Sequence, residues 1–272
     1  MRGHLNPAAA AGLVIVLALA AVAIFAPAIA PGDPLALSEQ ILRSPRGDHW
    51  MGTDDLGRDV FRRVVYGARV SITVGVVSAL IATVVGSLVG SLAGYFGGAV
   101  DDVLMRVTEV FQVIPRFLLA IVVVALLGAG QGKIILVIGF LSWPGTARIV
   151  RAQFLVFRGE EFVLAARGVG GSHARVIARH ILPNVVPFII VSGSLQTAAA
   201  ILVESFLSFL GLGDPTQPSW GLLLQNAQLY LRRAWWMAAF PGLALFVTIL
   251  SLNLAGDGVG EWLNPRRRRA VR

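Results

Sequence analysis

The histidine, serine and glycine residues of this chain form none of the motifs that usually support catalysis or metal binding. The histidines are at positions 4, 49, 173 and 180, without an H-E-x-x-H pair or a carboxylate at ligand spacing. No G-x-S-x-G motif occurs, and no cysteine is present as a thiol nucleophile. The stretch "GAGQGKII" fails as a phosphate-binding loop, because Leu127 and Ile134 replace its first glycine and its serine or threonine. We therefore expect no catalytic residue, no metal site and no cofactor bound by this chain.

The stretch "EEFVLAARGVGGSHARVIARHILPN", residues 160–184, is the most unusual polar segment. One helical face is apolar with two small residues at its middle, at the spacing i, i+3, i+4, i+7: Phe162, Ala165, Ala166 and Val169. Glycines at 168, 170 and 171 break this helix, and Ser172 is suited to cap a second short helix that Pro183 is expected to end. The ridge either inserts into a groove on another protein or lies with its apolar face on lipid.

The composition is that of a membrane protein. Of the 272 residues, 56% are hydrophobic and only 14% charged, with a mean hydropathy of +0.75, whereas a soluble domain has about 25% charged residues. The net charge of +8 therefore reflects basic cytoplasmic loops and tails, and we expect no nucleic-acid partner. The arginine run at 266–269 is expected to hold the C-terminus against anionic lipid.

A helix needs about 20 apolar residues to cross a bilayer. Five segments qualify: residues 8–30, 72–96, 117–127 with its flanks, 185–203 and 235–255. A sixth, 134–149, has a short uncharged core and runs through Arg148, so a re-entrant segment is its alternative. The sequence predicts an all-α, polytopic membrane protein with about six transmembrane helices.

Basic residues indicate the orientation of these spans. With six spans both termini share one side; that side holds fourteen of the Lys and Arg residues and the other holds nine, which favours cytoplasmic termini. The basic segment 54–69 on the outer side also carries Asp54, Asp55 and Asp59, and we interpret it as an interfacial amphipathic helix.

Two features within the apolar spans suggest function. Glu204 follows the run 185–203, where an ionisable group is costly; it either belongs to a translocation path or gate, or reaches water at the membrane surface. Three glycines four residues apart, Gly86, Gly90 and Gly94, allow another backbone to approach closely. They line a moving interface or serve tight packing within the bundle.

Several motifs in order resemble one family. Residues 160–184 resemble the EAA signature of ABC-importer permeases, with matching residues Ala165, Ala166, Gly170, Leu182 and Pro183. "HWMGTDDLGRDVFRRVVYGARVSI", "GYFGGAVDDVLMRVTEVFQVIP" and "ESFLSFLGLGDPTQPSWG" look like the C-type permease of dipeptide, oligopeptide and nickel importers. Leu164 replaces the signature glutamate and His180 its isoleucine; Glu161, one turn earlier, is our candidate for supplying the charge.

The resemblance implies a type I ABC importer permease that forms half of a translocation path for di- or oligopeptides in the bacterial inner membrane. Its implied partners are a homologous B-type permease, two cytoplasmic ATPase subunits that bind ATP and Mg²⁺, and an extracytoplasmic substrate-binding protein. The implied ATPase-coupling residues lie in the EAA loop: Glu161, Ala165, Ala166, Gly170, Ile177, Leu182 and Pro183. The chain itself would be a non-catalytic subunit.

The expected organisation has three parts. Residues 1–69 comprise a transmembrane helix with an extracytoplasmic or interfacial segment, residues 70–265 form a core of five transmembrane helices with a coupling loop at 148–183, and residues 266–272 form a basic cytoplasmic tail. The alternative is an ion-coupled secondary transporter or channel that uses Glu204. That class predicts inverted repeats or a series of buried charges, and the sequence shows neither.

Overall fold

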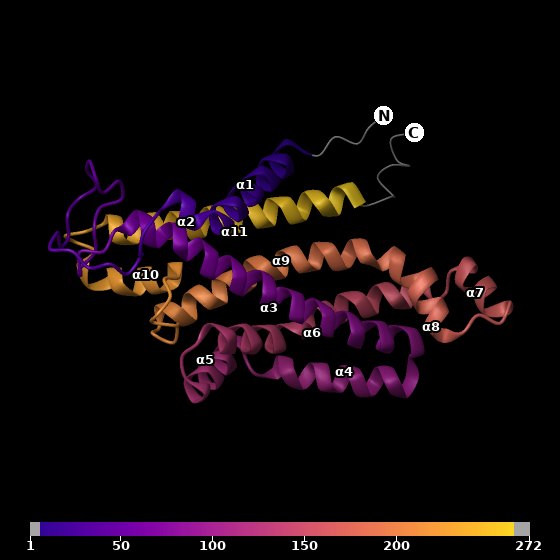
Figure 1. Ribbon diagram of the computed structural model, residues 1–272. Coiled ribbons are helices and arrows are strands. Elements are labelled where there is room, and N and C mark those ends of the chain that lie inside the picture. The colour runs from indigo at the N-terminus through magenta and orange to yellow at the C-terminus, as the bar shows by residue number, and fades with distance from the viewer. Residues whose placement is uncertain (1–5, 264–272) are drawn as a thin grey trace.

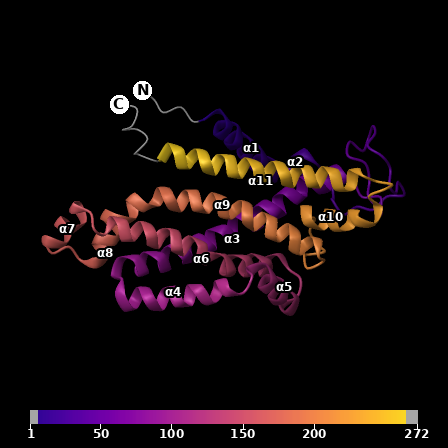
Figure 2. The same cartoon turned by 180° about the vertical axis from the view of Figure 1, so that it is seen from behind.

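The computed structural model describes residues 6–263, which fold into helices and no strand. Five long helices run side by side along the molecule: α1 (Pro7–Ile24), α3 (Val60–Phe96), α6 (Gln131–Phe157), α9 (Leu182–Phe209) and α11 (Trp236–Leu263) (Figures 1 and 2). Each is long and apolar enough to cross a membrane, and the bent pair α4 (Gly98–Val113) and α5 (Arg116–Leu127) makes a sixth candidate if its two helices count as one broken span. The prediction of an all-α protein with about six transmembrane helices is confirmed.

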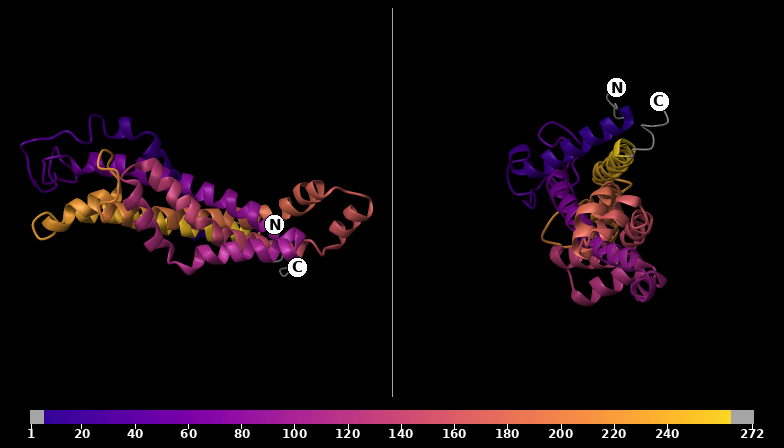
Figure 3. Two further views of the ribbon diagram at one scale, coloured as in Figure 1. Left: turned by 90° about the horizontal axis from the view of Figure 1, so that it is seen from below. Right: turned by 90° about the vertical axis from the view of Figure 1, so that its right-hand side faces the viewer.

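The short elements gather at the two ends of this bundle. Residues 30–59, α2 (Ala26–Ile29), α10 (Trp220–Ala227) and η2 (Gln228–Tyr230) lie at one end. Two short helices, α7 (Glu161–Gly168) and α8 (His173–Val176), project from the other end (Figure 3, left). The arginine run at 266–269 and the tail 266–272 lie outside the described residues.

The span predicted around 117–127 is divided differently in the structure. α5 has only 12 residues, and the stretch before it, which was not predicted as a helix of its own, forms the 16-residue helix α4, inclined at 77° to α5. Pro115 lies between them and prevents one continuous helix. Acidic and basic side chains lower the hydropathy of α4 and so conceal it, although Asp101 is paired with Arg151 of α6 at 2.5 and 2.6 Å.

The predicted segment 134–149 lies within the continuous 27-residue helix α6, so the re-entrant alternative is wrong. Arg148 interrupts its apolar sequence without interrupting its helix. The guanidinium of Arg148 is exposed and donates to the side-chain oxygen of Gln112 on α4 at 2.9 Å.

Pro183 does not end the second helix of the polar stretch, as the sequence suggested. The chain stays helical from His173 to Phe209, because residues 177–181 form a π-turn in which the amide of Leu182 bonds to the carbonyl of Ile177. A wider turn makes room for the proline ring, which would otherwise clash with the carbonyl four residues earlier. The side chain of Asn184 donates to the carbonyl of His180 at 2.7 Å.

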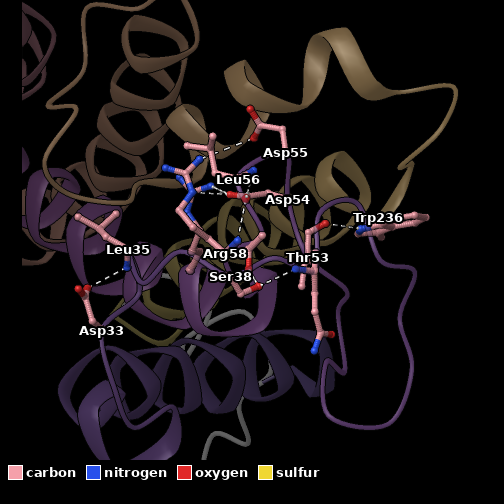
Figure 4. A network of polar contacts seen from close by, with 12 residues as sticks. Asp33, Leu35, Ser38, Thr53, Asp54, Asp55, Leu56, Arg58 and Trp236 are labelled. Carbon is pink, nitrogen blue, oxygen red and sulfur yellow. Dashed lines mark hydrogen bonds and ion pairs between the residues drawn. The ribbon is translucent and has the colours of Figure 1, made fainter.

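The segment 54–69 is not one amphipathic helix: residues 60–69 are the start of α3, and the aspartates before them organise a loop. The carboxylate of Asp54 accepts hydrogen bonds from the amides of Leu56 and Arg58, both at 2.9 Å, and from the side chains of Arg58 and Arg63 (Figure 4). Asp59 caps α3, which begins at Val60. The carbonyl of Thr53 accepts from the indole of Trp236 at 3.0 Å, so this loop is fastened to the start of α11.

The most extensive helix–helix packing within residues 6–263 joins α3 and α6 through the glycine ladder, Gly86, Gly90 and Gly94. A Cβ atom at Gly86, Gly90 or Gly94 would lie 2.7, 2.3 or 2.6 Å from atoms of α6. Only glycine permits this approach, as is usual where membrane helices pack closely. All three glycines are buried within this chain, so they provide intramolecular packing here.

Replacing Gly90 with alanine is expected to destabilise the protein. The added methyl would meet the carbonyl oxygen of Ala147 at 2.3 Å, and overpacking of this kind costs roughly 1–3 kcal/mol. Gly145→Ala on α6 is the matched control, because a Cβ there meets nothing within 4 Å. Thermal unfolding of the purified protein should show a lower Tm for Gly90→Ala alone; equal Tm values for both variants would contradict the packing.

Candidate functional site

Residues 158–181 form a projection beyond the end of the bundle, which we call the α7–α8 projection. Gly170, with φ of +79°, reverses the chain after α7, and the amide of Gly171 bonds to the carbonyl of Ala166 at 3.0 Å. The hydroxyl of Ser172 accepts from the amide of Arg175 and caps α8. The glycines and the serine therefore set the angle between the two helices.

An apolar core fixes the projection to the long helices. Val163 of α7 is completely buried and packs in one cluster with Val176, Ile181 and Val185, together with Phe154 of α6 and Tyr95 of α3. Three of the predicted coupling residues are partly buried against this cluster: Ala166, Ile177 and Leu182. They belong to the inner side of the projection.

Tyr95, near the end of α3, contacts both helices of the projection. Its hydroxyl forms a 2.9 Å hydrogen bond with Nδ1 of His173 on α8. The guanidinium of Arg167 on α7 lies 4.8 Å from the centre of the Tyr95 ring, which is a cation–π distance. The side chain of Arg158 also donates to the carbonyl of Gly94 at 3.2 Å. Movement of the projection relative to α3 would therefore break several contacts at once.

The outer face of α7 is exposed and has small residues along its centre. Glu161, Ala165 and Gly168 follow one another at i, i+4 and i+7 on this face, and all are exposed. Large apolar side chains flank them: Phe162, Leu164 and Val169, the last 87% exposed. Gly170 and Pro183, also predicted coupling residues, are exposed as well. The outer face is thus a narrow ridge of the kind that fits a groove.

Glu204 lies far from the projection, inside a cage of hydroxyl groups. Its side chain is only 2% exposed and accepts from the hydroxyls of Ser71 at 3.1 Å, Ser205 at 3.3 Å and Ser208 at 2.8 Å. Ser71 also accepts from the amide of Trp220 at 3.3 Å, so the cage joins α9, α3 and α10. Because its side chain is buried, Glu204 does not reach water at the membrane surface in this conformation, so that one of its two expected roles is not observed.

Two exposed charged residues on α4 were not singled out in the sequence, because no helix was predicted for this stretch. Arg106 and Glu109 lie on α4, beside α3 and α6, and both are exposed. The spacing of Asp102, Arg106 and Glu109, at i, i+4 and i+7, was the available sign of a helix with a charged side.

Within residues 6–263, no three acidic or histidine side chains cluster as metal ligands.

Replacing Glu204 with alanine is expected to loosen the cage more than replacing it with glutamine. Glutamine keeps an acceptor oxygen for the serines, whereas alanine leaves buried hydroxyls without one, at roughly 1–3 kcal/mol. Thermal unfolding should rank Glu204→Ala below Glu204→Gln. Equal stability of the two variants would show that the hydroxyl groups do not depend on this acceptor.

Comparison with known proteins agrees with this architecture. Residues 86–269 match the family model of the binding-protein-dependent transport system inner membrane component, and residues 5–45 match the N-terminal TM domain of oligopeptide transport permease C. The dipeptide transport system permease protein DppC of Bacillus subtilis is 42% identical over 97% of this chain and 83% of its own length. The glutathione transport system permease protein GsiD of Escherichia coli is 40% identical over 97% of this chain and 88% of its own.

The fold also matches that of a solved transporter. A chain of the MetNI methionine ABC transporter, in inward-facing conformations, superimposes with a TM-score of 0.61 at 18% identity, over 74% of this chain and 96% of the other. The chain therefore belongs to the binding-protein-dependent transport system inner membrane components, as a C-type permease of the ABC importers.

Proposed function

We propose that this chain is the C-type permease of an ATP-driven importer of di- or oligopeptides, and that α7 docks in a groove on an ATPase subunit. The exposed ridge of α7, backed by the buried anchor Val163, is the observation that carries the proposal. The dipeptide permease relative, aligned over nearly the whole chain, supports the choice of substrate class.

The proposed assembly contains a homologous B-type permease, two ATPase subunits and an extracytoplasmic substrate-binding protein. ATP and Mg²⁺ bind to the ATPase subunits, so this chain receives energy only by contact. The α7–α8 projection then faces the cytoplasm and residues 30–59 face outward. α1 begins and α11 ends toward the α7 half of the bundle, which supports cytoplasmic termini in the bacterial inner membrane (Figure 1).

The contacts at the base of the projection suit it to carry force. Val163 and Tyr95 hold α7 and α8 on the ends of α3, α6 and α9, so that a partner moving α7 also moves these long helices. The glycine ladder keeps α3 and α6 in direct backbone contact along the bundle. A closely packed pair of helices transmits displacement because it has few voids to absorb it.

Glu204 is proposed as part of a gate at the outer end of the bundle. Its cage joins α9 to α3 and α10, and Trp220 fastens α10 further by donating from its indole to the carbonyl of Val64 at 3.0 Å. An ion-coupled transporter would instead use Glu204 to bind or release a proton during transport. The serine hydroxyls that donate to its carboxylate favour a role in holding the three helices together over a role in proton binding.

ATP-driven uptake tests the function directly. The chain would be reconstituted in vesicles with its second permease, ATPases and binding protein, and uptake of a labelled dipeptide followed. We expect uptake that requires ATP and the binding protein, with none driven by an ion gradient in the absence of nucleotide. Gradient-driven uptake by this chain alone would establish the secondary-transporter alternative instead.

Replacing Ala165 with tryptophan is expected to weaken ATPase binding. Ala165 is exposed on the ridge, whereas Ala166 packs on the inner cluster, so only the first position tests docking without disturbing the fold. A steric cost of roughly 2 kcal/mol corresponds to about a thirtyfold loss of affinity. Ala174→Trp, at an exposed alanine on α8, is the control. Co-purification of the ATPase should fall for Ala165→Trp alone; unchanged co-purification would exclude α7 from the groove.

A further inference from the structure

The exposed half of α4 is divided into a charged flank and an apolar flank. Asp102, Arg106 and Glu109 form the charged flank, one above another at helical spacing, and all three are exposed. Val103, Val107 and Val110 form the apolar flank beside it. The buried side of the helix carries Asp101 and Thr108 and faces the bundle.

Arg106 and Glu109 have no partner among residues 6–263, because neither forms a hydrogen bond or ion pair there. Asp101 on the buried side differs, since Arg151 neutralises it through two hydrogen bonds. The charged flank thus offers hydrogen-bonding capacity that no contact within residues 6–263 uses in this conformation.

The depth of Glu109 in the membrane determines which surroundings can satisfy its carboxylate. α4 begins at Gly98, beside the end of α3, and runs back along α3 and α6 (Figure 1). Glu109 is eleven residues further on, so it lies roughly 16 Å along the helix. With Gly98 placed at the edge of the ~30 Å hydrocarbon layer, Glu109 is about half-way through that layer. Arg106 has a side chain long enough to extend toward the membrane surface, but a glutamate side chain is too short to reach it from that depth. Lipid tails cannot solvate this carboxylate.

We propose that the charged flank of α4 lines the water-filled passage through the transporter, with Glu109 at its middle. Arg148 of α6 supports this placement, because its exposed guanidinium bonds to Gln112 and extends the polar surface from α4 onto α6. Ionisable residues at membrane depth usually face a water-filled cavity and mark the route of a substrate. The inference rests on the proposed function, since it assigns the path that the importer would use.

The other long helices present a contrasting surface. The exposed side of α3 carries Val76, Leu80, Val84 and Leu88, which are apolar and four residues apart. Val84 is twelve residues before the end of α3, so its depth matches that of Glu109, and its side chain is 50% exposed. Glu109 and Val84 therefore lie at nearly the same depth along the bundle, but they differ in side-chain chemistry and lie on different helices.

Cysteine labelling tests the proposal, and the absence of native cysteine makes each substitution the single thiol of this chain. Glu109→Cys and Val84→Cys would be made in the complete transporter in vesicles and treated with a small, charged, membrane-impermeant methanethiosulfonate. Reaction requires an ionised thiolate in contact with water. We expect Glu109→Cys to react at least about tenfold faster than Val84→Cys, and at a rate that changes when the ATPases are trapped with nucleotide.

The outcomes separate this inference from the proposed function. If Glu109→Cys reacts no faster than Val84→Cys in either nucleotide state, the charged flank does not line an aqueous passage. Peptide uptake driven by ATP, measured for the unsubstituted transporter in the same vesicles, reports the proposed function independently. If Glu109→Cys is labelled faster but the unsubstituted transporter shows no ATP-driven uptake, the inference of an aqueous passage stands and the proposed importer function is overturned.

Discussion

Backbone contact between α3 and α6 is the constraint on which the other features depend. Because Gly86, Gly90 and Gly94 lie directly against α6, the ends of the two helices come together, and Tyr95 and Phe154 meet in one apolar cluster. That cluster is the base of the α7–α8 projection. α4 packs on the same pair through Asp101 and Arg151, which turns its charged flank outward. A wider spacing of α3 and α6 would disrupt the contacts that position both the α7–α8 projection and the charged flank of α4.

The sequence predicted the helical class, the number of spans and the helix–glycine–helix pattern at 160–183, because apolar length and glycine position are local properties. The side of α7 that is buried could not be predicted from the local sequence, because it depends on packing against other segments. Val163 is the anchor, a choice that follows from packing against Val176 and Ile181. The two adjacent alanines, equivalent in the sequence pattern, therefore lie on different sides of the helix, with Ala165 exposed and Ala166 partly buried.

The prediction errors have a common physical origin. α4 was not predicted as a separate helix because its charges lower hydropathy, although in the fold Asp101 is neutralised by Arg151, fifty residues away. Pro183 was taken for a helix end because the proline rule assumes a regular α-helix, whereas a π-turn relieves the clash. Asp54 was assigned to an amphipathic helix, but its partners are loop amides and two arginines. In each case a specific partner or turn overrides the local propensity.

The π-turn at 177–181 has a mechanical consequence. Because it preserves helicity past Pro183, residues from His173 to Glu204 lie on one unbroken rod, roughly 47 Å long at 1.5 Å per residue. A hydrogen bond between Tyr95 and His173 holds one end of this helix, and the serine hydroxyls hold the Glu204 carboxylate near the other end. A twist applied at one face of the membrane would thus reach the opposite face within a single piece of secondary structure, without crossing any interface between helices.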